Sequence, residues 1–361
     1  MVQDNSASQG AEEFVPLEIF ISNDARRITE IVIDLIINFV IASIGVVSNT
    51  LVIIVYAKQG FRDSVGVSMT TISVWDLIKC LGGVMQRMAG PINLWNPVYA
   101  LTWTNICLVV FNYLVSFSTY VTSVLAGYVA VERCLCVVFP LHIKRYLTTR
   151  VSWLICMLIS VVVFGWFVVI FGIYDVLWVW EPSFNATIAI YRFSSFSSQN
   201  SVVLFGFYNL SGTIWPIISL LVIVSSAGVI SSKLREASKF RQEQQRDYSS
   251  SSIKHAKQSA GKKLSTRDQK VMKMLLVIIA MFVINLSPRV VHYLAKSIVE
   301  DYYYLKKYHN LVHVVSYVIL FFDFLNGSVN LAIFLVMSSS FRATFFQVII
   351  HCRCTQKKSA Y

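Results

Sequence analysis

The sequence predicts an all-α membrane protein, a bundle of seven transmembrane helices followed by a short amphipathic eighth helix. Apolar residues make up 56% of the chain and charged residues only 14%, whereas soluble domains carry about 25% charged residues. A bilayer core about 30 Å thick needs about 20 apolar residues per helix. Seven stretches meet that length: 30–57, 67–88, 105–138, 151–173, 205–231, 270–297 and 312–336. Backbone groups in lipid must be paired within the segment, so these stretches are expected to be helices.

The apolar stretches divide the chain into three parts. Residues 1–29 form an extracellular N-terminal segment, 30–336 the seven-helix bundle, and 337–361 the amphipathic helix and cytoplasmic tail. Within the bundle, the connection 233–268 is rich in lysine, glutamine and serine. That composition is typical of a disordered cytoplasmic loop.

Charge sets the expected orientation. The chain carries a net charge of +12, and its lysines and arginines concentrate in the connections 139–150 and 232–269 and in the tail. Because positively charged loops stay in the cytoplasm, we expect a multi-pass plasma-membrane protein with its N-terminus outside. The same charge favours contact with anionic membrane lipids, and no nucleic-acid partner is expected.

Two kinds of modification are predicted. Asn185 opens an Asn-Ala-Thr glycosylation sequon in the connection placed outside. Cys352 and Cys354 follow the amphipathic stretch 341–346, where juxtamembrane cysteines suggest palmitoylation. Two unmodified cytosolic thiols are the alternative.

Short motifs recur in order along the spans. They are Gly45 to Asn49, Ser73 to Leu77 around Asp76, Glu132-Arg133-Cys134 with Pro140-Leu141, Pro216, Pro288, and Asn326 to Phe334. By their order and spacing the whole chain resembles the rhodopsin-like (class A) G-protein-coupled receptors. The run Val131 to Leu141 is similar to that of molluscan chemosensory receptors, which are close to peptide receptors.

The resemblance implies a receptor rather than an enzyme. A small-molecule or peptide ligand would move the sixth span outward and activate a heterotrimeric G protein, and an arrestin-like partner is also implied. We expect a chemosensory role, with a neuropeptide receptor of the same fold as the alternative. A membrane transporter is the alternative from another class, although no internal repeat supports it.

Several positions depart from the family pattern. Leu331 and Phe334 replace the proline and tyrosine of the seventh span, Leu286 the tryptophan of the sixth, Ser160 the tryptophan of the fourth, and Cys134 the motif tyrosine. These changes predict a modified signal relay.

The resemblance assigns G-protein coupling to the inner end of the third span. Glu132 and Asp268 are candidates to hold the Arg133 guanidinium, which offers five donors, and Leu141 belongs to the same coupling region. A bridge from Arg133 to Asp268 would clamp the third and sixth spans together. The alternative is an arginine that simply reaches the membrane surface.

A polar network is expected around Asp76, because a carboxylate in mid-membrane is costly unless it is paired. The resemblance directs Asn49, Thr122, Asn326 and Asn330 toward it. Oxygen ligands suit a sodium ion, which is the one candidate cofactor. Alternatively, Lys79 one turn away replaces that ion.

Candidate ligand-binding residues are Arg289, Asp323, Lys79, Arg87 and His292, with Lys296 extending the basic entrance. Arg289 could bind a ligand carboxylate through two hydrogen bonds. The alternative is an internal salt-bridge network. Val115 and Phe324 stand where the family's amine receptors and photoreceptors carry an aspartate and a retinal lysine, so neither ligand is expected.

The resemblance assigns the conformational switch to Pro216, Phe282 and Pro288. A proline inside a helix removes a backbone hydrogen bond and bends it. No metal site is expected, because His309 and His313 are too few to hold zinc.

Overall fold

The computed structural model describes residues 17–61, 63–139, 143, 146–250 and 266–358. The chain begins with α1 (Asn23–Thr29), the π-helix η1 (Glu30–Asn38), α2 (Phe39–Gln59), α3 (Ser64–Arg87), α4 (Ala89–Trp95), α5 (Pro97–Val109) and α6 (Phe111–Val138). It continues with α8 (Thr149–Phe167), the 3-10 helix η2 (Val168–Ile173), strands β1 (Tyr174–Glu181) and β2 (Ala186–Phe193), α9 (Ser195–Ser250), α10 (Thr266–Ile298), α11 (His309–Met337) and α12 (Ser339–Lys358).

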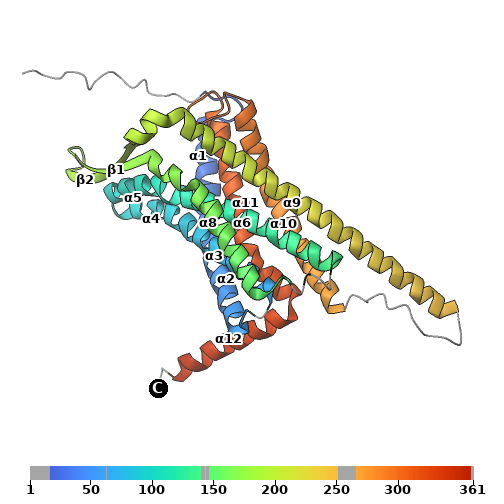
Figure 1. Ribbon diagram of the computed structural model, residues 1–361. Coiled ribbons are helices and arrows are strands. Elements are labelled where there is room, and N and C mark those ends of the chain that lie inside the picture. The colour runs from blue at the N-terminus through green and yellow to red at the C-terminus, as the bar shows by residue number, and fades with distance from the viewer. Residues whose placement is uncertain (1–16, 62, 140–142, 144–145, 251–265, 359–361) are drawn as a thin grey trace, which may run out of the picture.

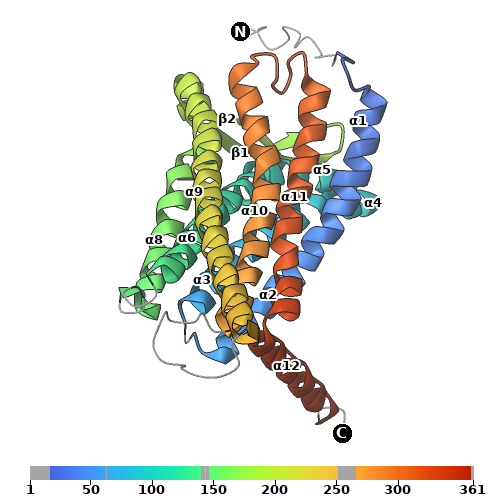
Figure 2. The same ribbon diagram turned by 90° about the vertical axis from the view of Figure 1, so that its right-hand side faces the viewer.

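The long helices run side by side as a bundle (Figure 2). Within the part of the chain that the structure describes, five runs are long and apolar enough to cross a membrane: Asn23–Gln59, Pro97–Val138, Thr149–Ile173, Ser195–Lys233 and His309–Val336. The helices α3 and α10 complete the seven, and they carry buried charged residues whose partners are described below. The α12 helix leaves one end of the bundle at an angle, and α1 begins at the other end (Figure 1).

Local sequence explains where the helices begin and end. Asp63 accepts a hydrogen bond from the backbone N–H of Gly66 at 2.8 Å and caps α3. Asn96 caps α5, whose first residue is Pro97. Gly60 ends α2 in the left-handed region with φ of 77°, which glycine adopts without a steric penalty.

The connection 174–204 contains a β-hairpin that was not predicted from the sequence. The strands pair antiparallel from Tyr174↔Phe193 to Glu181↔Ala186. The hairpin is fixed to α5, because Asn105 Nδ2 donates to the Ala189 carbonyl at 2.8 Å and the Ala189 N–H donates to Thr102 Oγ1 at 3.3 Å. The next helix, α9, begins at Ser195 and continues to Ser250, so part of the connection predicted to be a disordered cytoplasmic loop is helical.

The core lies around α3 and α6, whose buried residues contact several other helices. The Phe167 ring of α8 stacks on Phe117 at 4.6 Å and on Tyr120 at 4.8 Å between ring centroids. A Cβ atom on Gly83 would overlap the Phe324 ring, so this glycine lets α3 and α11 approach closely. That close approach positions the charged side chains of the two helices.

Candidate functional site

Near the C-terminal end of α6, Glu132 holds Arg133. Arg133 Nη2 lies 2.7 Å from Glu132 Oε1, and the two side chains are 13% and 1% exposed. Ser68 Oγ donates to Glu132 Oε2 at 3.2 Å, and Ser64 Oγ donates to Oε1. The Glu132 carboxylate therefore joins α6 to α3 while it holds the arginine. The Asp268 side chain and Leu141 lie outside the described residues, so the predicted clamp to Asp268 stays a prediction.

In the middle of the bundle, the carboxylate of Asp76 accepts two donors. Lys79 Nζ lies 2.6 Å from Asp76 Oδ1, and both side chains are fully buried. Asn330 Nδ2 of α11 donates to Asp76 Oδ2 at 3.1 Å. Each oxygen of Asp76 thus has a partner, and the Lys79 ammonium balances its charge.

The other predicted members of this network lie nearby with different partners. Asn49 Nδ2 donates to the carbonyls of Gly45 at 2.9 Å and Gly327 at 2.7 Å, which joins α2 to α11. Thr122 Oγ1 donates to the Thr119 carbonyl of its own helix at 3.0 Å. Asn326 is buried on α11. The structure therefore brings Asn330 and Lys79 to Asp76, and gives Asn49 a separate cross-link.

A second buried pair joins α10 to α11. Arg289 forms an ion pair with Asp323, and their side chains are 4% and 5% exposed. The guanidinium carbon of Arg289 lies 5.4 Å from the centroid of the Tyr120 ring of α6. Both residues were candidates for the ligand or for an internal salt bridge, and the structure contains the salt bridge.

Arg87 is also paired inside the bundle. It forms an ion pair with Asp34 of η1, and its Nε donates to the Asp34 carbonyl at 2.7 Å. Its Nη1 donates to the Gly83 carbonyl at 3.0 Å, and its guanidinium lies over the Phe324 ring at 5.1 Å. Arg87 therefore joins α3 to the first membrane-spanning run.

Aromatic side chains surround the basic residues at the C-terminal end of α10. His292 Nδ1 lies 3.0 Å from the hydroxyl oxygen of Tyr302. Lys296 Nζ lies over the rings of Tyr304, Tyr303 and Tyr293, at 4.7, 5.2 and 5.5 Å from their centroids. The outer end thus combines a cation with several π faces.

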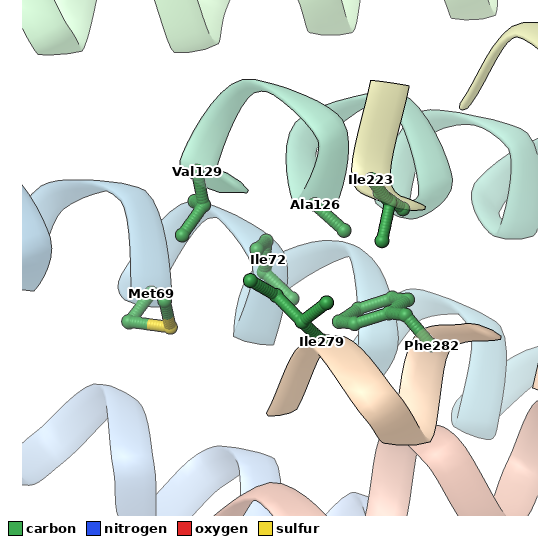
Figure 3. A pocket seen from close by; sticks show the side chains of 7 residues that line it. All are labelled: Met69, Ile72, Ala126, Val129, Ile223, Ile279 and Phe282. Atoms are coloured by element: carbon green, nitrogen blue, oxygen red, sulfur yellow. The ribbon is translucent and has the colours of Figure 1, made fainter. Parts of the chain in front are cut away.

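The three residues predicted to form the switch lie in α9 and α10. Pro216 is inside α9, and Pro288 is inside α10. Phe282 of α10 points into a small apolar cavity (Figure 3). The residues that line the cavity come from α3, α6, α9 and α10: Met69, Ile72, Ala126, Val129, Ile223, Ile279 and Phe282. Free space beside Phe282 gives the α10 side chains room to shift.

Comparison with known proteins identifies the family. A family model described as serpentine type 7TM GPCR chemoreceptor Srw matches residues 36–352. The chain belongs to this family. No curated protein matches the chain. The seven-helix bundle is thereby confirmed, and the protein is a multi-pass membrane receptor and not an enzyme.

The predicted modification sites of the receptor lie at its two ends. Asn185 is exposed in the turn of the β1–β2 hairpin, where its φ of 48° is one that asparagine tolerates. Cys352 and Cys354 lie on α12, and their side chains are outside the described part of the chain.

Two features of this receptor were not predicted from its sequence. Asp34 was not singled out, although an acidic residue within the first apolar stretch needs a partner. The run Tyr302-Tyr303-Tyr304, which supplies the rings beside His292 and Lys296, was also missed. Three consecutive tyrosines at the outer end of a span were the available signal.

Proposed function

We propose that this chemoreceptor is a plasma-membrane receptor that couples an external ligand to a heterotrimeric G protein by outward movement of α10. The observation that carries the proposal is the Glu132–Arg133 pair at the inner end of α6, in a chain of the GPCR chemoreceptor family. The order of its motifs supports a rhodopsin-like receptor, and the run Val131 to Leu141 supports a molluscan-type chemosensory branch.

Release of Arg133 is the step that would expose the G-protein site. A guanidinium presents five donors in a fixed plane, and Glu132 engages part of them in the structure. The two side chains are largely shielded from water, so this hydrogen bond must break before Arg133 can contact a G protein. A ligand that binds the open bundle more tightly than the closed one shifts the receptor toward the state with Arg133 free.

The test is second-messenger output from cells that express the receptor, screened with amino acids, small carboxylates and short peptides. Arg133→Ala should abolish the response to an active compound while the receptor stays at the cell surface. A peptide as the active compound would favour the neuropeptide alternative. Ligand-driven flux across the membrane without any G-protein response would contradict the proposal and favour a transporter.

The Arg133–Asp268 clamp has a test of its own. We expect Asp268→Ala to raise ligand-free signalling, because loss of the carboxylate removes one of the two groups proposed to hold Arg133. Basal calcium and cyclic-nucleotide levels measure this effect. Unchanged basal output at equal surface expression would contradict the clamp.

The proposed orientation places α1 and the hairpin outside and α12 inside. The distribution of lysine and arginine supports it. An epitope tag at the N-terminus should then be detected on intact cells, and a tag at the C-terminus only after permeabilisation. The reverse pattern would overturn the orientation.

Lys79 is proposed to supply the positive charge that a sodium ion would otherwise bring to Asp76. Its ammonium already contacts Asp76 Oδ1, and a second cation beside a buried ammonium would add repulsion in a medium of low dielectric constant. We therefore expect sodium to leave the thermal stability of the wild-type receptor unchanged. Lys79→Ala should make that stability sodium-dependent. A sodium-dependent wild type would favour the ion instead.

The remaining proposed partners, membrane lipids and an arrestin-like protein, would bind at the cytoplasmic side. Palmitoylation of Cys352 and Cys354 would hold α12 at the membrane, where anionic lipids attract the basic tail. The serines of the 233–268 connection are proposed phosphorylation sites for an arrestin-like partner.

A further inference from the structure

Four cations inside the bundle are each paired with a carboxylate. The pairs are Lys79–Asp76, Arg87–Asp34, Arg133–Glu132 and Arg289–Asp323. Lys296 differs from them. Among the residues that the structure describes, it contacts no carboxylate and donates no hydrogen bond. A cation that is removed from water is costly unless it is paired, so this ammonium is suited to receive an anion.

The surroundings of Lys296 are aromatic. The ammonium lies within 5.5 Å of the centroids of Tyr293, Tyr303 and Tyr304, and its side chain is half-buried. Ring faces attract a cation, but they accept none of the three N–H donors as a carboxylate would. The rings hold the ammonium in place and leave its hydrogen bonds available.

The rings are themselves fixed in position. The Tyr293 ring packs against Gly212 of α9, where a Cβ atom would overlap it, and its hydroxyl lies 3.4 Å from that of Tyr208. The Tyr304 hydroxyl lies 3.0 Å from Ser316 Oγ on α11. These contacts join α9, α10 and α11 around Lys296.

The rings from the outer loop add no negative charge. Burial raises the pKa of Tyr303 above its usual value, so its hydroxyl stays protonated near neutral pH. Glu300 of the same loop forms its ion pair with Lys306, and neither Glu300 nor Asp301 forms an ion pair with Lys296 in the described structure. The charge of Lys296 is therefore not balanced by its own loop.

We propose that Lys296 anchors the anionic group of the receptor's ligand, and that the tyrosines around it hold an aromatic part of the same molecule. The ligand class is a small aromatic carboxylate. The proposal rests on the proposed function, because it takes the outer end of α10 as the ligand side. It differs from the expectation that Arg289 binds the ligand carboxylate, because the charge of Arg289 is balanced by Asp323.

The position of Lys296 explains how such a ligand would act. It lies seven residues beyond Arg289 on α10, about 10 Å along the helix axis. A carboxylate bound there would contact the outer end of α10. The same helix contains Pro288 and, further inward, Phe282. Ligand binding and the switch are thus parts of one helix.

Binding to the purified full-length receptor in lipid nanodiscs tests the proposal. The probes are phenylacetate and indole-3-acetate, each compared with its primary amide, and the readout is the shift in thermal unfolding midpoint with probe concentration. We expect the carboxylates to bind at least tenfold more tightly than the amides. Lys296→Met should lower carboxylate affinity at least tenfold, and Lys296→Arg should retain most of it.

Lys307→Met is the matched control, because Lys307 is an exposed lysine of the outer loop that lies 5.5 Å from the Tyr308 ring centroid. It should leave carboxylate affinity unchanged. Equal affinity for acids and amides, no shift with either acid, or full carboxylate affinity in Lys296→Met would overturn the proposal. The measurement contains no G protein, so its failure is distinct from a failure of coupling, which the Arg133→Ala response reports.

Discussion

The middle and the outer end of this bundle use charge differently. In the middle, Arg289 and Lys79 are buried against the carboxylates of Asp323 and Asp76. At the outer end, Lys296 lies among tyrosine rings with no carboxylate in the described residues. The comparison separates Arg289 and Lys79, which acids hold in place, from Lys296, which we propose is available to a ligand.

The largest expected effect is on the Arg289–Asp323 pair. Removing one partner leaves a buried charge without its counter-ion, which costs about 3–5 kcal/mol. We therefore expect Asp323→Ala to lower the thermal unfolding midpoint sharply and to deplete the receptor from the cell surface.

The double variant Arg289→Met/Asp323→Leu is the control, because it removes both charges and should recover much of the lost stability. Lys296→Met should change the free energy of unfolding by less than about 1 kcal/mol. Equal destabilisation by Asp323→Ala and Lys296→Met would contradict the proposed difference between the acid-paired cations in the middle of the bundle and Lys296.

A smaller effect is expected where α3 meets α11. Gly83→Ala places a methyl group on the Phe324 ring, and overpacking of this kind costs about 1–3 kcal/mol. Gly165→Ala on α8 is the matched control, because a Cβ atom added there would meet no neighbouring atom within 4 Å. Thermal unfolding of the two purified variants measures the difference, and equal midpoints would show that α3 and α11 have room to separate.

The smallest effect is expected at Asn185. The side chain is exposed in the hairpin turn, so Asn185→Gln should remove a glycan and change stability by less than about 0.5 kcal/mol. Electrophoretic mobility before and after glycosidase treatment reports the glycan. If glycosidase treatment does not change the mobility of the wild-type receptor, then either this turn lies away from the lumen or Asn185 is not modified.

The sequence predicted the parts of the fold that depend on hydrophobicity along the chain. The seven apolar stretches correspond to the long helices, because each must bury its backbone groups within itself. The hairpin 174–193 was not predicted, since its strands are stabilised by each other and by contacts of Ala189 with α5. Those contacts join residues more than 80 positions apart.

The sequence predicted most of the residues that form the candidate site, but it did not predict every pair that they form with each other. Asp76 and Lys79 are three residues apart on one helix, so their contact followed from helical spacing. Arg87 and Asp34 are 53 residues apart, and only the tertiary packing of the bundle brings them together. The environment of Lys296 depends on how the loop between α10 and α11 folds back, which no local pattern records.

The rate of nucleotide exchange by a heterotrimeric G protein on the purified receptor measures whether release of Arg133 activates the G protein. Glu132→Gln weakens the interaction that holds Arg133. A loss of about 1 kcal/mol in that interaction raises the ratio of receptor with Arg133 released to receptor with Arg133 held about fivefold. We expect faster ligand-free exchange for Glu132→Gln, and no receptor-dependent exchange for Arg133→Ala or for the double variant. Exchange that continues at the wild-type rate in Arg133→Ala would contradict it.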